Sequence, residues 1–168
     1  MAISIKEAAM VLGCGLFCVG MARWSSHTTD QVLQQGKTTV CTVSGSGNNM
    51  IVGFAVDGAA QQIVIGRPYA RLYEGETFAL KYLDDDLKNA EVLFWEPVFD
   101  SKLFAPTPAT SLEDSWTNPP VSFTYTVDGK NFERSQKLQP GKELDELKQV
   151  RVLYKKSDPR IAYLVYER

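Results

Sequence analysis

The sequence predicts a mainly β protein in which two tandem copies of a small antiparallel module, sandwich-like or barrel-like, follow an apolar N-terminal helix. Two observations predict the strands. Large apolar residues recur at every second position over 50–56, and apolar and polar residues alternate over 121–127, both with the period of a strand. Both runs lead into an Asp-Gly dipeptide, at 57–58 and 128–129, which favours a two-residue hairpin turn.

Composition and charge indicate a globular protein that does not bind nucleic acid. Hydrophobic residues make up 44% of the 168-residue chain and charged residues 23%, as in globular proteins. Residues 23–120 hold 7 basic and 12 acidic side chains, whereas 121–168 hold 10 basic and 7 acidic ones. We interpret this asymmetry as two solvated surfaces of modest opposite charge. Basic runs interleaved with aromatic residues are absent from the sequence, so we expect no nucleic-acid partner.

The N-terminal segment, residues 1–24, contains an uncharged apolar stretch at 8–22. As a helix this stretch would be about 22 Å long, shorter than the ~30 Å hydrocarbon core of a bilayer. Arg23 and Trp24 follow it and suit a membrane interface, so a retained anchor in a thinned bilayer is one interpretation. We therefore expect the membrane to be a partner of this segment.

Three other interpretations of the same segment stay open. A signal peptide would be cleaved after the small-x-small triplet at 20–22. A lipoprotein signal would use Cys14, which ends a Val-Leu-Gly-Cys sequence at 11–14. A plain buried core helix is the fourth interpretation. An anchor, a signal peptide or a lipoprotein signal would each make the protein membrane-anchored or exported. We expect an extracytoplasmic location, and both orientations of a retained anchor stay open.

The polar residues 25–36 predict a collar helix that ends at Gly36 and leads into the first β module, residues 37–96. A second β module is predicted at 120–168, because the order of features repeats. The two Asp-Gly turns are 71 residues apart, and Pro68 and Tyr82 match Pro140 and Tyr154 at an offset of 72. A single-residue insertion accounts for the change of offset, so we interpret the pattern as an internal duplication.

Proline is concentrated between the two predicted modules. Residues 96–120 hold five of the eight prolines of the chain. Proline lacks the N–H that a central strand must donate, so we predict that residues 97–119 form an extended linker over the surface.

The second module carries a family resemblance. The hairpin sequence Tyr-Thr-Val-Asp-Gly at 125–129 is followed by a strand and turn at 150–160, which contains Val152, Tyr154 and Asp158-Pro159. This arrangement resembles a widespread bacterial family of β domains of unknown function whose members are commonly attached to membrane helices. The resemblance covers residues 121–168 well, whereas the matching turn of the first half, at 82–87, lacks the prolines. It implies a membrane-linked β module and brings no activity with it.

The sequence offers no recognisable catalytic, cofactor or metal site. The single histidine, His27, lies in the predicted collar, so a Ser-His-Asp or Cys-His arrangement would depend on a residue outside the β modules. The three cysteines, Cys14, Cys18 and Cys41, do not have the spacing of a zinc site. We therefore expect no enzyme activity, no cofactor and no bound metal.

Two tryptophans flank the proline-rich segment and are the candidates for a binding groove. Trp95 precedes the segment and Trp116 lies near its end. We predict that they bind an unknown protein or envelope partner, which would make the chain a binding or structural protein of the bacterial envelope. The alternative is a small carboxylate-dependent extracytoplasmic hydrolase, which would need two carboxylates about 5–9 Å apart in a cleft.

Overall fold

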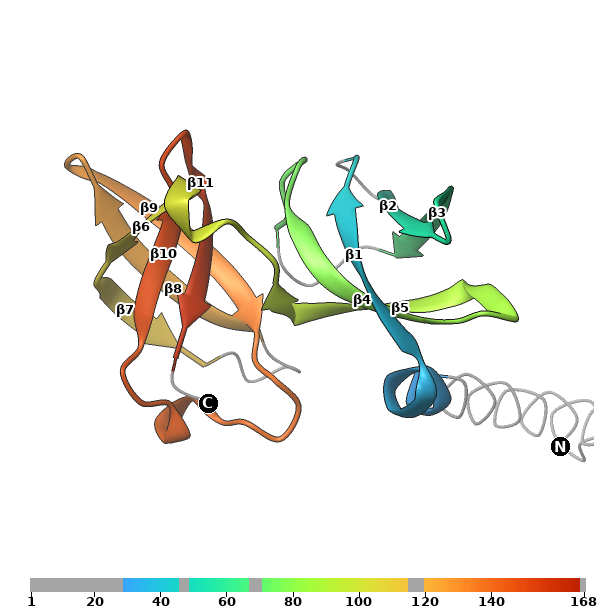
Figure 1. Ribbon diagram of the computed structural model, residues 1–168. Helices are drawn as coiled ribbons and strands as arrows, with labels where there is room; N and C mark the ends of the chain where they lie inside the picture. Colours follow the sequence, from blue (N-terminus) through green and yellow to red (C-terminus); the bar gives the residue numbers. More distant parts are fainter. Residues whose placement is uncertain (1–28, 46–48, 67–70, 115–119, 167–168) are drawn as a thin grey trace, which may run out of the picture. The chain divides into compact units, whose positions relative to one another are not determined.

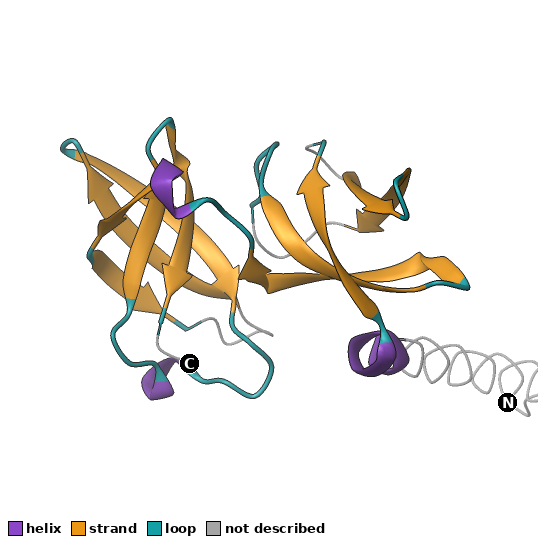
Figure 2. Ribbon diagram, in the orientation of Figure 1, coloured by secondary structure: helices purple, strands orange, loops and turns teal. Residues whose placement is uncertain are grey.

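The computed structural model describes residues 29–45, 49–66, 71–114 and 120–166 (Figure 1). Strands dominate the described part, with helical structure confined to residues 29–35 and two short 3-10 turns (Figure 2). The prediction of a mainly β fold is therefore confirmed. The apolar stretch 8–22 and His27 lie outside the described residues. Within the part of the chain that is described, no helix is long and apolar enough to cross a membrane.

Eleven strands belong to the described residues and form three antiparallel sheets. In chain order the strands are β1 (Lys37–Val43), β2 (Asn49–Val56), β3 (Ala59–Gly66), β4 (Thr77–Leu83), β5 (Asp86–Pro97), β6 (Phe104–Thr107), β7 (Ala109–Glu113), β8 (Pro120–Val127), β9 (Lys130–Lys137), β10 (Arg151–Lys155) and β11 (Asp158–Val165). The 3-10 turns are η1 (Ser101–Leu103) and η2 (Leu144–Glu146). The sheet orders are β3-β2-β1-β4-β5, β11-β10-β6 and β7-β8-β9.

The chain divides into two compact units, of which the smaller contains the described residues 29–37 and Lys81–Glu91. Its helical residues 29–35 end at Gly36, whose N–H donates to the Val32 carbonyl at 2.9 Å. A Cβ at Gly36 would lie 2.4 Å from that carbonyl oxygen, so only glycine fits this helix end. The Lys81 ammonium donates to the Leu33 carbonyl, which connects the segment Lys81–Glu91 of this unit to the helical turn. These contacts support the helical part of the predicted collar over 29–35.

The larger unit contains Thr38–Leu80 and the chain from Val92 onward. Its first hairpin joins β2 to β3 through Asp57 and Gly58, whose φ angles of 49° and 80° are both positive. This is the backbone that a two-residue turn with right-handed strand twist requires. One face of β1, β2 and β4 is buried, with Cys41, Val43, Val52, Phe54, Phe78 and Leu80 in its core.

The proline-rich segment differs from the predicted linker, because residues 104–113 are two strands. Pro108 separates β6 from β7, and the two parts pair with different sheets: β6 with β10, and β7 with β8. Each lies at the edge of its sheet, where a proline does not interrupt a ladder on both sides. The two three-stranded sheets therefore include strands that precede residue 120.

The core of the second half lies between its two three-stranded sheets. Its buried residues come from β8, β10 and β11: Val121, Phe123, Tyr125, Val127, Val152, Ala162 and Leu164. The β8–β9 hairpin turns at Asp128 and Gly129, with φ angles of 49° and 75°. As at the first hairpin, both turn residues have positive φ, so the prediction of two Asp-Gly hairpins is confirmed.

A buried glutamine connects the two sheets on the side away from Pro108. The Gln136 side chain on β9 donates to the Leu164 carbonyl at 3.1 Å and accepts from the Leu164 N–H at 2.8 Å. Both bonds reach β11, so one side-chain amide pairs with both backbone groups of a residue in the other sheet. These two bonds take the place of strand-to-strand hydrogen bonds between β9 and β11, which belong to different sheets and do not pair with each other.

Candidate functional site

The candidate site is a groove that starts at the end of β5, where Trp95, Glu96 and Pro97 follow one another. β5 ends at Pro97, which cannot donate to a neighbouring strand. The chain beyond it is held in place, because the Val98 N–H donates to the Thr77 carbonyl at 3.0 Å. Asp100 then caps η1 by accepting from the Lys102 N–H at 2.9 Å. This edge of the groove is thus held by one backbone hydrogen bond and by the side-chain cap of Asp100.

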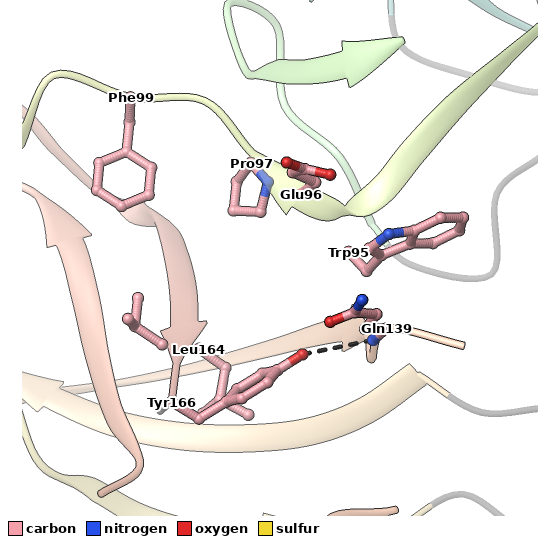
Figure 3. A pocket seen from close by; sticks show the side chains of 8 residues that line it. Trp95, Glu96, Pro97, Phe99, Gln139, Leu164 and Tyr166 are labelled. Atoms are coloured by element: carbon pink, nitrogen blue, oxygen red, sulfur yellow. Dashed lines mark hydrogen bonds between the residues drawn. The ribbon is translucent and has the colours of Figure 1, made fainter. Parts of the chain in front are cut away.

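The first hollow of the groove has a cavity volume of about 270 Å³. Its walls are Trp95, Glu96, Pro97 and Phe99 on one side and Gln139, Leu164, Val165 and Tyr166 on the other (Figure 3). The Tyr166 hydroxyl accepts from the Gln139 N–H at 3.4 Å, which positions this ring beside the loop after β9 (Figure 3). Three aromatic rings and a proline therefore line a hollow that also contains a carboxylate and an amide.

A second hollow, with a cavity volume of about 580 Å³, shares Trp95 and Gln139 with the first. Its other lining residues are Asp114, residues 137–138 and residues 140–144, which bring both signs of charge. A capping box orders this loop, because Glu143 and Glu146 each accept from the other residue's backbone N–H at the start of η2. We call the two hollows together the Trp95 groove.

Of the two predicted partner-binding residues, Trp95 lines both hollows and Trp116 lies outside the described residues. Sequence reasoning missed Phe99, Gln139 and Tyr166, which come from three segments far apart in the chain. A signal was present for Phe99, since it lies four residues after Trp95 in the proline-rich segment. Nothing local marks Gln139 or Tyr166, because their role depends on how β9 and β11 are placed.

A buried ion pair lies elsewhere in the larger unit. The Glu76 carboxylate accepts from the Arg134 guanidinium at 2.7 Å, and these residues are only 1% and 4% exposed. Arg134 also donates to the Arg71 carbonyl at 2.6 Å, and its guanidinium lies 5.0 Å from the centre of the Tyr73 ring. Burial raises the pKa of Glu76 to about 7, against the opposing attraction of Arg134.

We assign a structural role to the Glu76–Arg134 pair. Neither Glu76 nor Arg134 lines the Trp95 groove, and two of their polar atoms, Glu76 Oε2 and Arg134 Nε, are buried with no hydrogen-bond partner among the described residues. A buried charge pair of this kind holds two segments in register and is costly to break. Across the described ranges, no group of three or more His, Cys, Asp or Glu residues is arranged to hold a metal ion.

Comparisons with known proteins add no relative: no family model, curated protein or solved structure matches the chain.

Proposed function

We propose that this protein is a membrane-linked binding protein that holds an extended peptide segment of a partner in the Trp95 groove. The observation that carries the proposal is the meeting of Trp95, Phe99 and Tyr166 with Pro97 in an open hollow. Aromatic rings around a shallow groove suit proline and other apolar side chains of an extended peptide. The Gln139 amide and the Glu96 carboxylate supply the few polar groups that orient a ligand.

The second hollow favours a peptide over a compact small molecule. It continues from Trp95 along the loop 137–144, so the binding surface extends in one direction. Lys142 and Glu143 line it together, so a partner segment with side chains of both charges meets a complementary group. A proline-rich or aliphatic core with charged flanks is the ligand that this arrangement favours.

A binding role is favoured over a catalytic one by where the perturbed carboxylate lies. Glu76, whose pKa burial raises to about 7, is paired with Arg134 and lines neither hollow. The carboxylates of the groove are Glu96 in the first hollow and Asp114 and Glu143 in the second. The hydrolase alternative would require two of these three to act together, and Glu96→Gln or Glu143→Gln would then abolish turnover in a hydrolase screen.

We also propose that the two β halves are copies of one module. Each half contains a hairpin with an Asp-Gly turn, β2–β3 and β8–β9, whose turn residues all have positive φ. Each continues to a second hairpin with a two-residue turn, at 84–85 and 156–157, which preserves the offset of 72. In each half a preceding strand lies beside both hairpins: β1 beside β2 and β4, and the β6–β7 segment beside β10 and β8.

The groove is tested by selecting ligands and then removing the tryptophan. The full chain in detergent is panned against a phage-displayed random peptide library, and enriched peptides are titrated by calorimetry. We expect the enriched peptides to contain proline or aliphatic residues. Trp95→Ala should bind them at least about tenfold more weakly, because a central aromatic side chain contributes much of the binding free energy of such a contact. Leu103→Ala, which removes an exposed apolar side chain outside the groove, is the control.

Either of two results would contradict the peptide-binding proposal: no peptide is enriched, or Trp95→Ala binds as well as the parent chain. The membrane link is tested separately by fractionating cells that carry the full chain and cells that carry a chain starting at Ser25. We expect the full chain to be in the membrane or exported fraction, and its presence wholly in the cytosol would contradict this part of the proposal.

A further inference from the structure

Within the described residues, the strand β3 is an edge of the five-stranded sheet. It lies at one end of the order β3-β2-β1-β4-β5, so β2 is its one strand neighbour among the described residues. Its eight residues, AAQQIVIG, contain neither a charge nor a proline. Such an edge offers a row of backbone donors and acceptors to another strand.

The other edges of the described sheets are blocked. Each of the edge strands β5, β6, β7, β9 and β11 has a charged residue or a proline within its bounds: Glu91 in β5, Pro106 in β6, Glu113 in β7, Lys130 in β9 and Pro159 in β11. Charges and prolines are the devices that keep edges from pairing. Among the strands at described sheet edges, β3 alone lacks both.

An apolar surface accompanies this edge. Ile51 and Val64 are directly opposite each other in the β2–β3 ladder and are 37% and 66% exposed. Thr42 pairs with Gly53, and Gly53 pairs with Gln62, so the period of two places Val40, 48% exposed, on the same face. We call Val40, Ile51 and Val64 the outer face. β2 and β3 carry no charged residue, so nothing on these two strands repels an identical surface.

We propose that β3 pairs antiparallel with β3 of a second copy of this chain across a two-fold axis. Identical strands pair symmetrically, so the contact closes on itself and yields a dimer. The C-terminal part of β3 carries apolar residues on both of its faces, with Val64 on the outer face and Ile63 and Ile65 on the other, whereas Gln61 and Gln62 precede them. The best partner for β3 is a strand that presents matching apolar side chains on each face of the joined sheet. The β3 strand of a second copy meets this requirement.

The alternation of side chains selects the register. Residues that face each other across the axis must lie on the same face of the joined sheet, so their numbers must both be even or both be odd. Placing Val64 opposite Val64 of the second copy brings Ile63 opposite Ile65 on the other face. This register puts apolar residues together on both faces and extends the row of Ile51 and Val64 across the axis.

The test uses the full chain in detergent and measures its association by sedimentation equilibrium. We expect a reversible dimer. Val64→Lys and Val64→Glu, each alone, place two like charges directly opposite each other and should weaken the dimer at least about tenfold. An equal mixture of the two variants should form a mixed dimer, because the introduced ammonium of one copy then meets the introduced carboxylate of the other. Since Val64 is largely exposed, both variants should keep the circular dichroism spectrum of the parent chain.

Val40→Lys is the matched control, since it charges the outer face away from the edge and should leave the dimer intact. Four outcomes would each overturn the proposal. The parent chain is monomeric at all concentrations, Val64→Lys dimerises normally, or the mixture of variants stays monomeric. In the fourth, Val40→Lys dissociates the dimer as strongly as Val64→Lys, which would assign the contact to the outer face rather than to the edge.

Discussion

At the scale of single residues, Gln136 is a buried polar side chain that joins the two sheets of the second half. Its amide pairs with both backbone groups of Leu164, and all of these atoms are buried. Gln136→Met keeps the volume and removes both bonds, so two backbone groups are left unpaired in the core. We expect a loss of about 2–4 kcal/mol in the free energy of unfolding, measured by urea denaturation. Gln139→Met, at an exposed glutamine three residues further along, should change stability by less than about 0.5 kcal/mol.

Gln136 is a useful test because its two bonds are directional. Gln136→Glu retains the acceptor for the Leu164 N–H but cannot donate to the carbonyl when ionised, so it should also destabilise the fold. If Gln136→Met is as stable as the parent chain, the amide does not join the two sheets.

Glu76 makes stability depend on pH. Burial raises its pKa from 4.5 to about 7, so the folded state favours the neutral carboxyl. The stability that this preference provides is fully present below pH 4.5 and is lost as the pH rises through about 7. Glu76→Gln is neutral throughout, so its free energy of unfolding relative to the parent chain should increase by about 2 kcal/mol between pH 5 and pH 8. Urea denaturation at the two pH values measures this difference.

The exposed neighbour Glu74 provides the control for this pH effect. Glu74→Gln should show the same difference from the parent chain at both pH values. A pH-independent difference for Glu76→Gln would mean that Arg134 keeps the carboxylate ionised in the folded state at both pH values.

Contacts between individual residues are the feature of the structure that the sequence predicts least well. The alternation of apolar residues identifies core positions such as Phe123 and Tyr125, because a strand repeats every two residues. It does not identify partners that are distant in the chain. Glu76 and Arg134 are 58 residues apart, and Gln136 and Leu164 are 28 apart. Such pairs depend on the arrangement of the sheets, which no local pattern encodes.

At the scale of elements, the Asp-Gly turns set the register of two hairpins. Gly129 has a φ of 75°, and a Cβ there would meet no atom within 4 Å. Gly129→Ala therefore introduces backbone strain without a clash, and we expect it to lower the free energy of unfolding by about 1–2 kcal/mol. Gly58→Ala, at a φ of 80° and equally open, should cost a similar amount. Thermal unfolding of the two variants measures both costs.

Asp128→Asn is the matched variant for the same turn. Asn tolerates positive φ well, so this change should leave the midpoint of thermal unfolding within a few degrees of the parent value. A Gly129→Ala variant as stable as the parent chain would show that the turn readily adopts another conformation.

These turns were predictable because their signal is local, whereas β6 and β7 were not. The Asp-Gly dipeptide needs only its two residues to favour the backbone that the hairpin uses. The composition of the proline-rich segment predicts a linker, since Pro106 and Pro108 would interrupt a central strand. The structure places both strands at sheet edges, where a strand pairs on one side only. The composition predicts that the segment is extended. Its pairing with β10 and β8 follows from its position at the sheet edges, which the composition does not show.

At the scale of the whole molecule, we expect the strands β6 and β7 to determine which residues a fragment of the second half must contain in order to fold. β10 and β8 each lie between two strands, and one of the two is β6 or β7. Ala109 and Leu112 on β7 also pack against the core of the second half. We therefore expect that a fragment of residues 120–168 does not fold, and that a fragment of residues 98–168 does.

The fragment experiment must also account for Arg134, whose partner Glu76 lies outside both fragments. An unpaired buried charge costs several kcal/mol, so both fragments should carry Arg134→Met. Urea denaturation followed by circular dichroism should then give a cooperative transition for 98–168 and none for 120–168. With 71 residues the longer fragment buries a small core, so its free energy of unfolding should be only a few kcal/mol. Cooperative folding of 120–168 with equal stability would show that β6 and β7 are dispensable, and the absence of folding in both fragments would show that the second half depends on the first.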